Sequence, residues 1–136
     1  LVDTGDLRAV VCDPAAVKHV NLLTVRKEDL AFKSDFSLRA TRNDYVHAFL
    51  GWFDIGFEAC HKPVRFSTGP HSRYTHWKQT VFYTPNTLTV SQGDTIEGRL
   101  TCTPNVRNPR DLDISIRYNV VGPNPVSGEL AYKMYV

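Results

Sequence analysis

The sequence predicts an all-β domain, a β-barrel of short strands with at most a few helical turns. Short runs of β-branched and aromatic residues alternate with Pro, Gly, Asn and Asp along the whole chain, and no internal repeat is visible. So many short strands would leave long unpaired edges in an open sheet, which favours closure into a barrel. At 136 residues, the chain can form one domain with its own core, and we assign residues 1–136 to it.

The first third of the chain predicts two strands. A run rich in Val and Leu at residues 17–25 indicates the first strand, and a helical turn is expected just before it, at residues 13–17. Residues 27–29 are charged and form a polar turn. From Phe36 to Ala40 apolar and polar residues alternate, which is typical of a strand with one buried face.

The segment 45–58 is apolar enough to be one strand but too long for a domain of this size. A straight strand of this length would span about 46 Å at roughly 3.3 Å per residue. We therefore expect it to bend at Gly51 and Gly56, because a glycine inside a strand permits a bulge or a corner.

The second half of the chain continues the β pattern. In the segment 113–121 every second residue is apolar, so one face of that strand should be buried. Turn residues separate the runs. The further strands are expected at residues 79–83, 95–103, 113–121 and 130–136, with turns at residues 91–94 and 103–105.

Composition excludes several classes of protein. A net charge of +2 is too small for a nucleic-acid-binding face, and no apolar run approaches the roughly 20 residues of a membrane span. Three widely spaced cysteines leave one unpaired in any disulfide scheme, so a reducing compartment, the nucleus and cytoplasm, is expected. Because the sequence opens on Leu1 without signal character, we expect it to be part of a longer protein.

Two groups of residues could carry chemistry but are better explained without it. The densest group of possible metal ligands is Cys60 and His61 with His71 and His76. Because Cys60 and His61 are adjacent, they would point to opposite faces of a strand, so no metal site is expected. Nucleotide-binding and common hydrolase motifs are also missing from the sequence.

The second group is the pair Asp111 and Asp113, which would project from one face of a strand. The pair could raise one pKa for acid–base catalysis or attract a cation, but a solvated surface pair is the commoner case. Neighbouring arginines could neutralise it; these are Arg107, Arg110 and Arg117.

The most unusual composition is the polar loop at residues 72–80, in which His76 and Trp77 are adjacent. Such a loop can simply pack its aromatic side chains against the domain, or it can carry a functional site. Composition alone favours packing.

The same loop carries a resemblance to a known family. Residues 74–83, with Thr75-His76-Trp77 at their centre, resemble the Thr-His-Trp loop of protein arginine methyltransferases. The resemblance extends over roughly residues 2–120, and its other segments resemble the barrel of the predominant type I branch in the same order. These segments are residues 42–48, 60–62, 66–68 and 110–113.

The resemblance implies a function for the intact protein. In this family a Rossmann-like α/β domain binds S-adenosylmethionine and carries the catalytic glutamates, while the C-terminal barrel walls the substrate groove. Only the barrel half is expected here, so no cofactor-binding residue is assigned, and this chain alone should bind no S-adenosylmethionine and be inactive. The family's helical dimerisation arm should lie upstream of Leu1, which puts a homodimer of this chain alone in doubt.

The resemblance also assigns roles to three residues. His76 should contact an acidic residue of the donor domain in a supporting catalytic role, and Thr75, His76 and Trp77 should line the arginine pocket. The implied products are monomethyl and asymmetric dimethyl arginine. Implied partners are Arg-Gly-rich proteins and histone tails as substrates, the N-terminal methyl-donor domain and, for the full-length enzyme, a homodimer. The alternative is a non-catalytic β-barrel module that binds peptides.

Overall fold

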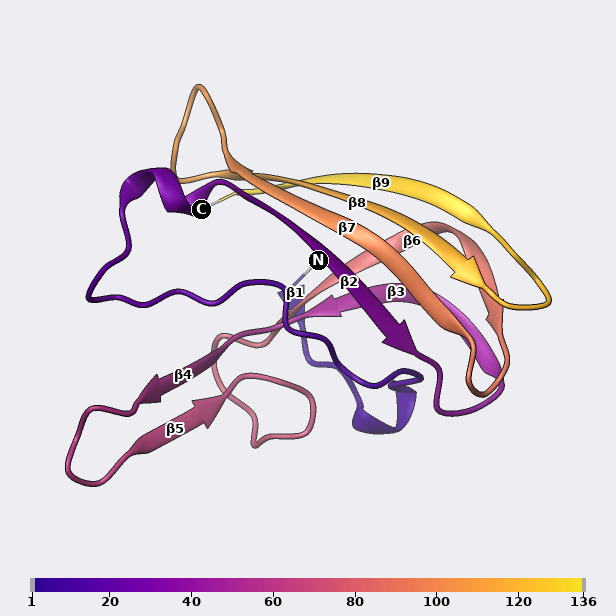
Figure 1. The fold of residues 1–136 in the computed structure, drawn as a ribbon, viewed down its shortest axis with the longest axis horizontal. Coiled ribbons are helices and arrows are strands. Elements are labelled where there is room, and N and C mark those ends of the chain that lie inside the picture. The colour runs from indigo at the N-terminus through magenta and orange to yellow at the C-terminus, as the bar shows by residue number, and fades with distance from the viewer. Residues whose placement is uncertain (1, 136) are drawn as a thin grey trace. The chain divides into compact units, whose positions relative to one another are not determined.

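The structure, a computed structural model, describes residues 2–135. Within these residues the regular structure consists of nine strands and two short 3-10 helices, so the mainly β class is confirmed (Figure 1). No described helix is long and apolar enough to cross a membrane. The elements are β1 (Val2–Asp3), η1 (Leu7–Ala9), η2 (Lys27–Leu30), β2 (Phe32–Arg39), β3 (Asp44–Gly51), β4 (Asp54–Phe57), β5 (Val64–Ser67), β6 (Gln79–Val90), β7 (Thr95–Pro104), β8 (Leu112–Val121) and β9 (Ser127–Met134).

The chain divides into two units. The first, which we name the loop unit, comprises Leu1–Val10 and Ala48–Tyr83. The second, the sheet unit, comprises Val11–His47 and Thr84–Val136. The strands β3 and β6 each contribute residues to both units, and the predicted site residues all belong to the loop unit.

The sheet unit is built on an antiparallel sheet of four strands in the order β2-β7-β8-β9, which run side by side in Figure 1. As predicted, β8 buries every second residue, namely Ile114, Ile116, Tyr118 and Val120. Burial also alternates along β2, so its predicted one-sided pattern is confirmed. Removing these apolar side chains from water is the main stabilising contribution to the unit.

Two glycines make room for large rings on the buried face of this sheet. A Cβ atom on Gly128 would lie 2.3 Å from the Tyr118 hydroxyl oxygen, and one on Gly98 would lie 2.2 Å from the Arg117 carbonyl oxygen and 2.6 Å from the Phe36 ring. Both positions therefore require glycine for close packing.

The solvent-facing side of the same sheet carries a row of four charges across its four strands. Asp35, Arg99, Arg117 and Glu129 lie opposite one another in register, so two arginines sit between two acids. Each arginine pairs with its acidic neighbour, at 2.7 Å for Arg99–Asp35 and 3.4 Å for Arg117–Glu129. The outer acids thus offset the repulsion between the central arginines.

The two turns predicted in the second half of the chain differ in outcome. The predicted turn at residues 91–94 forms with Gly93 at a φ of 90°, and the amide of Asp94 donates to the carbonyl of Ser91 at 2.9 Å. The turn predicted at residues 103–105 is displaced, because β7 continues to Pro104. The strand predicted at residues 79–83 is part of the longer β6, and the one predicted at 130–136 begins at Ser127; residue 136 lies outside the described residues.

The predictions for residues 13–25 are wrong. The helical turn is absent because Cys12 bridges Ala40 and the amide of Asp13 donates to the carbonyl of Arg39, which keeps the chain extended. The strand at 17–25 is absent because Asn21 forms a turn, accepting from the amides of Thr24 and Val25. Local turn chemistry overrides the apolar pattern here.

In the loop unit the predicted bend at Gly51 is confirmed, whereas the one at Gly56 is wrong. β3 ends at Gly51, and two residues outside any strand precede β4. Gly56 lies in regular antiparallel pairing with Arg65 of β5. A two-stranded hairpin needs no corner, since no third strand has to be kept in register. A three-stranded sheet in the order β1-β6-β3 also contributes to this unit, and in it β1 pairs with the start of β6.

Candidate functional site

The predicted Thr-His-Trp segment ends a loop of the loop unit that leaves β5 at Ser67 and enters β6 at Gln79. The loop closes with a turn in which the amide of Lys78 donates to the carbonyl of Thr75 at 3.1 Å. Lys78 has a φ of 56°, a left-handed conformation that is uncommon for a residue other than glycine. Such strain persists only where surrounding contacts hold the chain.

Trp77 is held by two phenylalanines of the same unit. Its ring stacks on Phe66 at 5.7 Å and 22°, and meets the edge of Phe53 at 5.7 Å and 76°. Phe66 belongs to β5, and Phe53 precedes β4. About half of Trp77, 47%, nevertheless remains exposed. The indole is therefore oriented by its neighbours while one part of it stays accessible.

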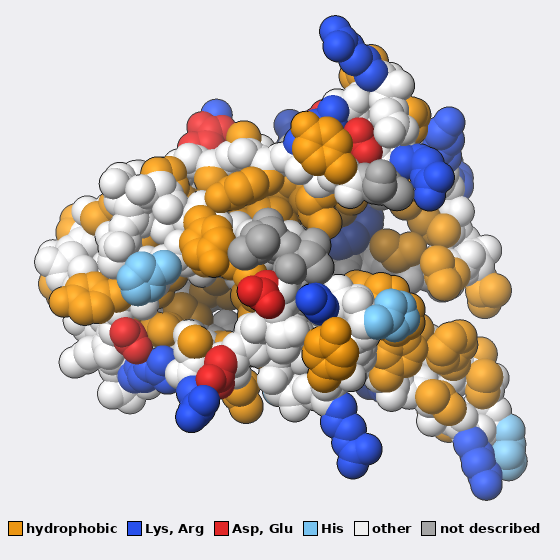
Figure 2. Space-filling view, turned by 180° about the vertical axis from the view of Figure 1, so that it is seen from behind, with side chains coloured by type: hydrophobic (Ala, Val, Ile, Leu, Met, Phe, Trp, Pro, Cys, Tyr) orange, Lys and Arg blue, Asp and Glu red, His pale blue; other side chains and the backbone are white. Residues whose placement is uncertain are grey.

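His76 lies against this indole. The two rings are 4.0 Å apart at an angle of 34°, and His76 itself is exposed. On the face shown in Figure 2, pale blue histidine side chains lie at the surface beside orange hydrophobic ones. The packing interpretation therefore holds for the inner part of Trp77 but leaves the imidazole of His76 available to a partner.

Thr75 is placed differently from its two neighbours. It is half-buried, and its hydroxyl oxygen is buried without a hydrogen-bond partner among residues 2–135. Such an oxygen lowers stability, because its bond to water is lost and not replaced. The structure thus brings His76 and Trp77 together in contact and places Thr75 at the start of the turn, with its hydroxyl buried.

Sequence reasoning missed the residues that support the loop. Phe53 was expected only as a strand residue, and the others only as parts of longer segments: Phe66 and Thr68 of a segment that carries the family resemblance, and Gln79 of the loop and the strand after it. Thr68 and Gln79 are two of the buried polar residues of the chain, at 1% and 6% exposure. A polar residue at the start of an apolar run, as at Gln79, is the signal that could have pointed to them.

Within the described residues, no three His, Cys, Asp or Glu side chains gather as a metal site would require. Cys60 and His61 were expected to lie on a strand. They lie instead in the exposed turn between β4 and β5.

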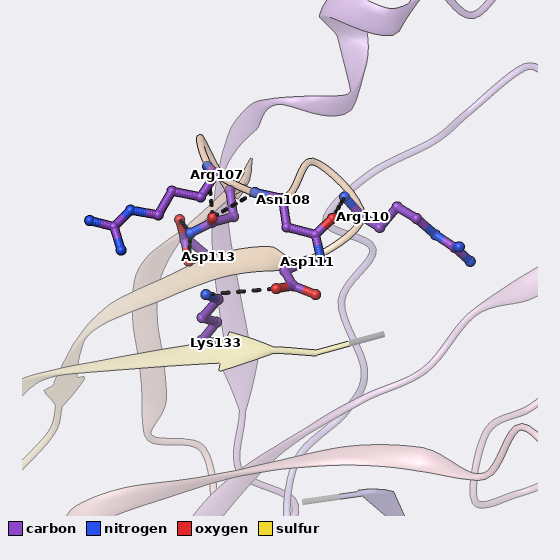
Figure 3. Close-up of polar contacts among 7 residues, drawn as sticks. Arg107, Asn108, Arg110, Asp111, Asp113 and Lys133 are labelled. Carbon is purple, nitrogen blue, oxygen red and sulfur yellow. Dashed lines mark hydrogen bonds and ion pairs between the residues drawn. The ribbon is translucent and has the colours of Figure 1, made fainter.

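The acidic pair near β8 differs from its prediction. Asp113 is exposed and accepts from Asn105, at 3.0 Å, but Asp111 is buried, so the expectation that both are solvated is wrong. Asp111 precedes the strand, and its carboxylate lies 3.7 Å from the ammonium of Lys133 on β9 (Figure 3). Figure 3 also shows the side chain of Arg110 extending away from Asp111.

The loop geometry can support recognition of a cation. A partly exposed indole can pack beside a guanidinium, and an exposed imidazole can pair with a carboxylate or take up a proton. Both side chains are oriented by ring contacts before any partner arrives, which reduces the entropy lost on binding.

The family model for the arginine methyltransferase oligomerization subdomain matches residues 1–123. The chain is 59% identical to protein arginine N-methyltransferase 1 of Schizosaccharomyces pombe over 98% of its own length, and 51% identical to that of Caenorhabditis elegans over 90%. It covers 41% and 35% of those proteins, so it spans about two-fifths of its relatives.

Solved structures give the same result. A chain of the Trypanosoma brucei PRMT1 enzyme-prozyme heterotetrameric complex with AdoHcy matches with a TM-score of 0.94 and 36% identity, over 99% of this chain and 43% of that one. Arabidopsis thaliana protein arginine methyltransferase 10 matches with a TM-score of 0.91 at 20% identity, over 99% and 42%, which shows the fold alone. This chain therefore belongs to the protein arginine methyltransferase family and is similar to the C-terminal portion of its type I members.

Proposed function

We propose that this chain forms the wall of the substrate groove, and the scaffold beneath it, in a protein that methylates arginine side chains of other proteins. The observation that supports this most directly is the arrangement at Trp77, which two phenylalanines hold while leaving it partly exposed. In this proposal the indole packs beside the guanidinium of the substrate. The products are monomethyl and asymmetric dimethyl arginine.

His76 has a supporting role in the same proposal. Its exposed imidazole pairs with a carboxylate of the methyl-donor domain and thereby holds the loop at the arginine pocket. The same imidazole can help to remove the proton that the arginine nitrogen loses on methylation. Thr75 lines the pocket from beneath, where its buried hydroxyl is available for a hydrogen bond.

In this proposal the chain itself holds no S-adenosylmethionine. Two of the buried polar side chains, Thr68 and Gln79, are engaged with other parts of the chain, and the sequence has no glycine-rich nucleotide loop. The donor is therefore bound by the methyl-donor domain of the full-length protein, and no step is assigned to it here.

The remaining parts of the proposal concern the full-length protein. Its substrates are Arg-Gly-rich segments and histone tails, it acts in the nucleus and cytoplasm, and it assembles as a homodimer. The match to a family model described as an oligomerization subdomain supports the assembly.

The test is to compare His76→Ala with His19→Ala in the full-length protein, measuring turnover and thermal stability. His19 is also exposed but lies outside the loop. We expect His76→Ala to lower turnover at least tenfold, a barrier increase of about 1.4 kcal/mol, with little loss of stability. Near-normal turnover would return His76 to a packing role, and a full-length protein that binds arginine peptides without methylating them would favour the non-catalytic module.

A further inference from the structure

The base of the Thr-His-Trp loop is closed by a side chain and not only by backbone. Gln79 begins β6 and Thr68 begins the loop. The side-chain Nε2 of Gln79 donates to the backbone carbonyl of Thr68 at 2.5 Å. One side chain thus joins the last residue of the loop to its first. Gln79 is 6% exposed and Thr68 is 1% exposed, so water does not compete for this bond.

The other end of the same amide reaches a third segment. The side-chain Oε1 of Gln79 accepts from the backbone amide of Gly5 at 2.5 Å. Gly5 lies in the segment that follows β1. The loop base and the N-terminal segment are therefore joined through one side chain. A Cβ atom on Gly5 would lie 2.8 Å from the Leu50 side chain, so a residue larger than glycine would disturb this approach.

Thr68 extends the connection to the ring that orients Trp77. Its hydroxyl donates to the carbonyl of Phe53 at 2.9 Å and accepts from the amide of Phe53 at 3.1 Å. The backbone of Phe53 is thus fixed at the point from which its ring meets Trp77. Hydrogen bonds and ring contacts therefore run continuously from Gln79 through Thr68 and Phe53 to the indole.

A buried amide is a costly way to fill this space. An apolar side chain of similar length would avoid the loss of hydration, so the amide is useful only for the two bonds that it makes. Lys78, directly before Gln79, has a strained left-handed conformation. Such a conformation persists only where contacts hold the chain, and Gln79 supplies them on the C-terminal side of the turn.

We propose that Gln79 is a positioning residue of the Thr-His-Trp loop, which holds the loop to its own base and to the N-terminal segment. It touches no substrate in this proposal and acts through Thr68, Phe53 and Trp77. The inference rests on the proposed function for its catalytic consequence, but the loosening of the loop can be measured in the 136-residue chain without any activity.

The first measurement is amide hydrogen exchange by NMR on the chain carrying Gln79→Met, which keeps the length and loses both bonds. The reporting amides are those of Ser72 and Lys78, which donate within the loop. We expect exchange there to be at least tenfold faster, with the amides of β7 and β8 unchanged within twofold. The control is Gln92→Met, an exposed glutamine in the turn before β7.

Two outcomes of this measurement are decisive. Unchanged exchange at Ser72 and Lys78 would overturn the proposal, since the side-chain amide of Gln79 would then not stabilise the loop. If Gln79→Met loses the protection of β7 and β8 as well, the variant has unfolded, and Gln79→Asn replaces it. That variant stays polar but is too short to reach both partners.

The second measurement is the turnover of full-length Gln79→Met. We expect turnover to fall at least fivefold while the Michaelis constant for the methyl donor is unchanged, a separation that general destabilisation would not produce. Normal turnover in a loosened loop, with His76→Ala still impaired, would overturn the positioning role. If neither variant alters turnover although the loop is loosened, the proposed function of the loop fails while its attachment by Gln79 stands.

Discussion

At the scale of single residues, two threonines of the loop unit differ in whether their hydroxyl groups are hydrogen-bonded. Both have hydroxyl oxygens out of contact with solvent, but the Thr68 hydroxyl makes two hydrogen bonds with Phe53, and the Thr75 hydroxyl has no partner among the described residues. Because valine has nearly the shape of threonine, the same substitution separates the two cases.

We expect Thr75→Val to raise the free energy of unfolding of this chain by about 1 kcal/mol, since it removes a buried oxygen that has lost its water. Thr68→Val should lower the same quantity by about 1–3 kcal/mol, because it leaves the backbone amide of Phe53 without its partner, whereas the Phe53 carbonyl still accepts from the Thr68 amide. Urea denaturation monitored by tryptophan fluorescence measures both. A loss of stability in Thr75→Val would mean that this hydroxyl has a partner after all.

The three cysteines differ in accessibility. Burial, with a smaller contribution from the carboxylate of Asp13, raises the pKa of the Cys12 thiol to about 11, and burial raises the pKa of the Cys102 thiol as well. Cys60 is exposed in the turn between β4 and β5.

Because the thiolate is the reactive form, we expect iodoacetamide at pH 8 to modify Cys60 first and Cys12 much more slowly. The rate at Cys12 should still be rising between pH 9 and pH 10, since a thiol with a pKa of about 11 is only partly ionised there. Peptide mass spectrometry over a pH series follows each site. Equal rates at Cys12 and Cys60 at pH 8 would contradict the burial of Cys12.

At the scale of elements, the buried face of the four-stranded sheet depends on the absence of side chains at Gly98 and Gly128, whereas Gly56, in the β4–β5 hairpin, has no such role. A Cβ atom on Gly98 would meet a backbone carbonyl, that of Arg117, which cannot move without disturbing the pairing of β7 with β8. A Cβ atom on Gly56 would meet only the side chain of Glu58, at 3.2 Å, and that side chain can rotate away.

We therefore expect Gly98→Ala to lower the free energy of unfolding by about 2–3 kcal/mol, whereas Gly56→Ala should change it by less than about 0.5 kcal/mol. Urea denaturation of the two variants beside the parent chain tests the difference. Similar midpoints for both variants would show that the sheet accommodates the extra methyl group at Gly98.

At the scale of the whole molecule, the chain corresponds to about two-fifths of its relatives. No glycine-rich nucleotide loop occurs in its sequence, and its polar residues at the loop base are engaged with one another. In the proposed function, this portion of the family fold positions the substrate and the methyl donor is held elsewhere.

We accordingly expect the purified 136-residue chain to show no binding of S-adenosylmethionine by isothermal titration calorimetry and no methylation of arginine peptides. The full-length protein measured beside it is the control for ligand and assay. A micromolar dissociation constant for the isolated chain would place a donor site within these residues.

The sequence by itself determined the β class, the buried face of β8 and the turn at Gly93. Alternation and turn chemistry are local properties, which do not depend on distant parts of the chain. It also identified the Thr-His-Trp loop, through its resemblance to a family. Where a local pattern was ambiguous, as at residues 17–25, it failed, because an apolar run becomes a strand only when another strand lies beside it.

Only the tertiary structure decided what surrounds the loop. Trp77 contacts both Phe53 and Phe66. Gln79 joins Thr68 to Gly5. Both arrangements depend on segments brought together from separate parts of the sequence. A single side chain does not encode its partners; they are set by the packing of the whole unit, since a buried amide must find whichever carbonyl and amide groups the fold places within its reach.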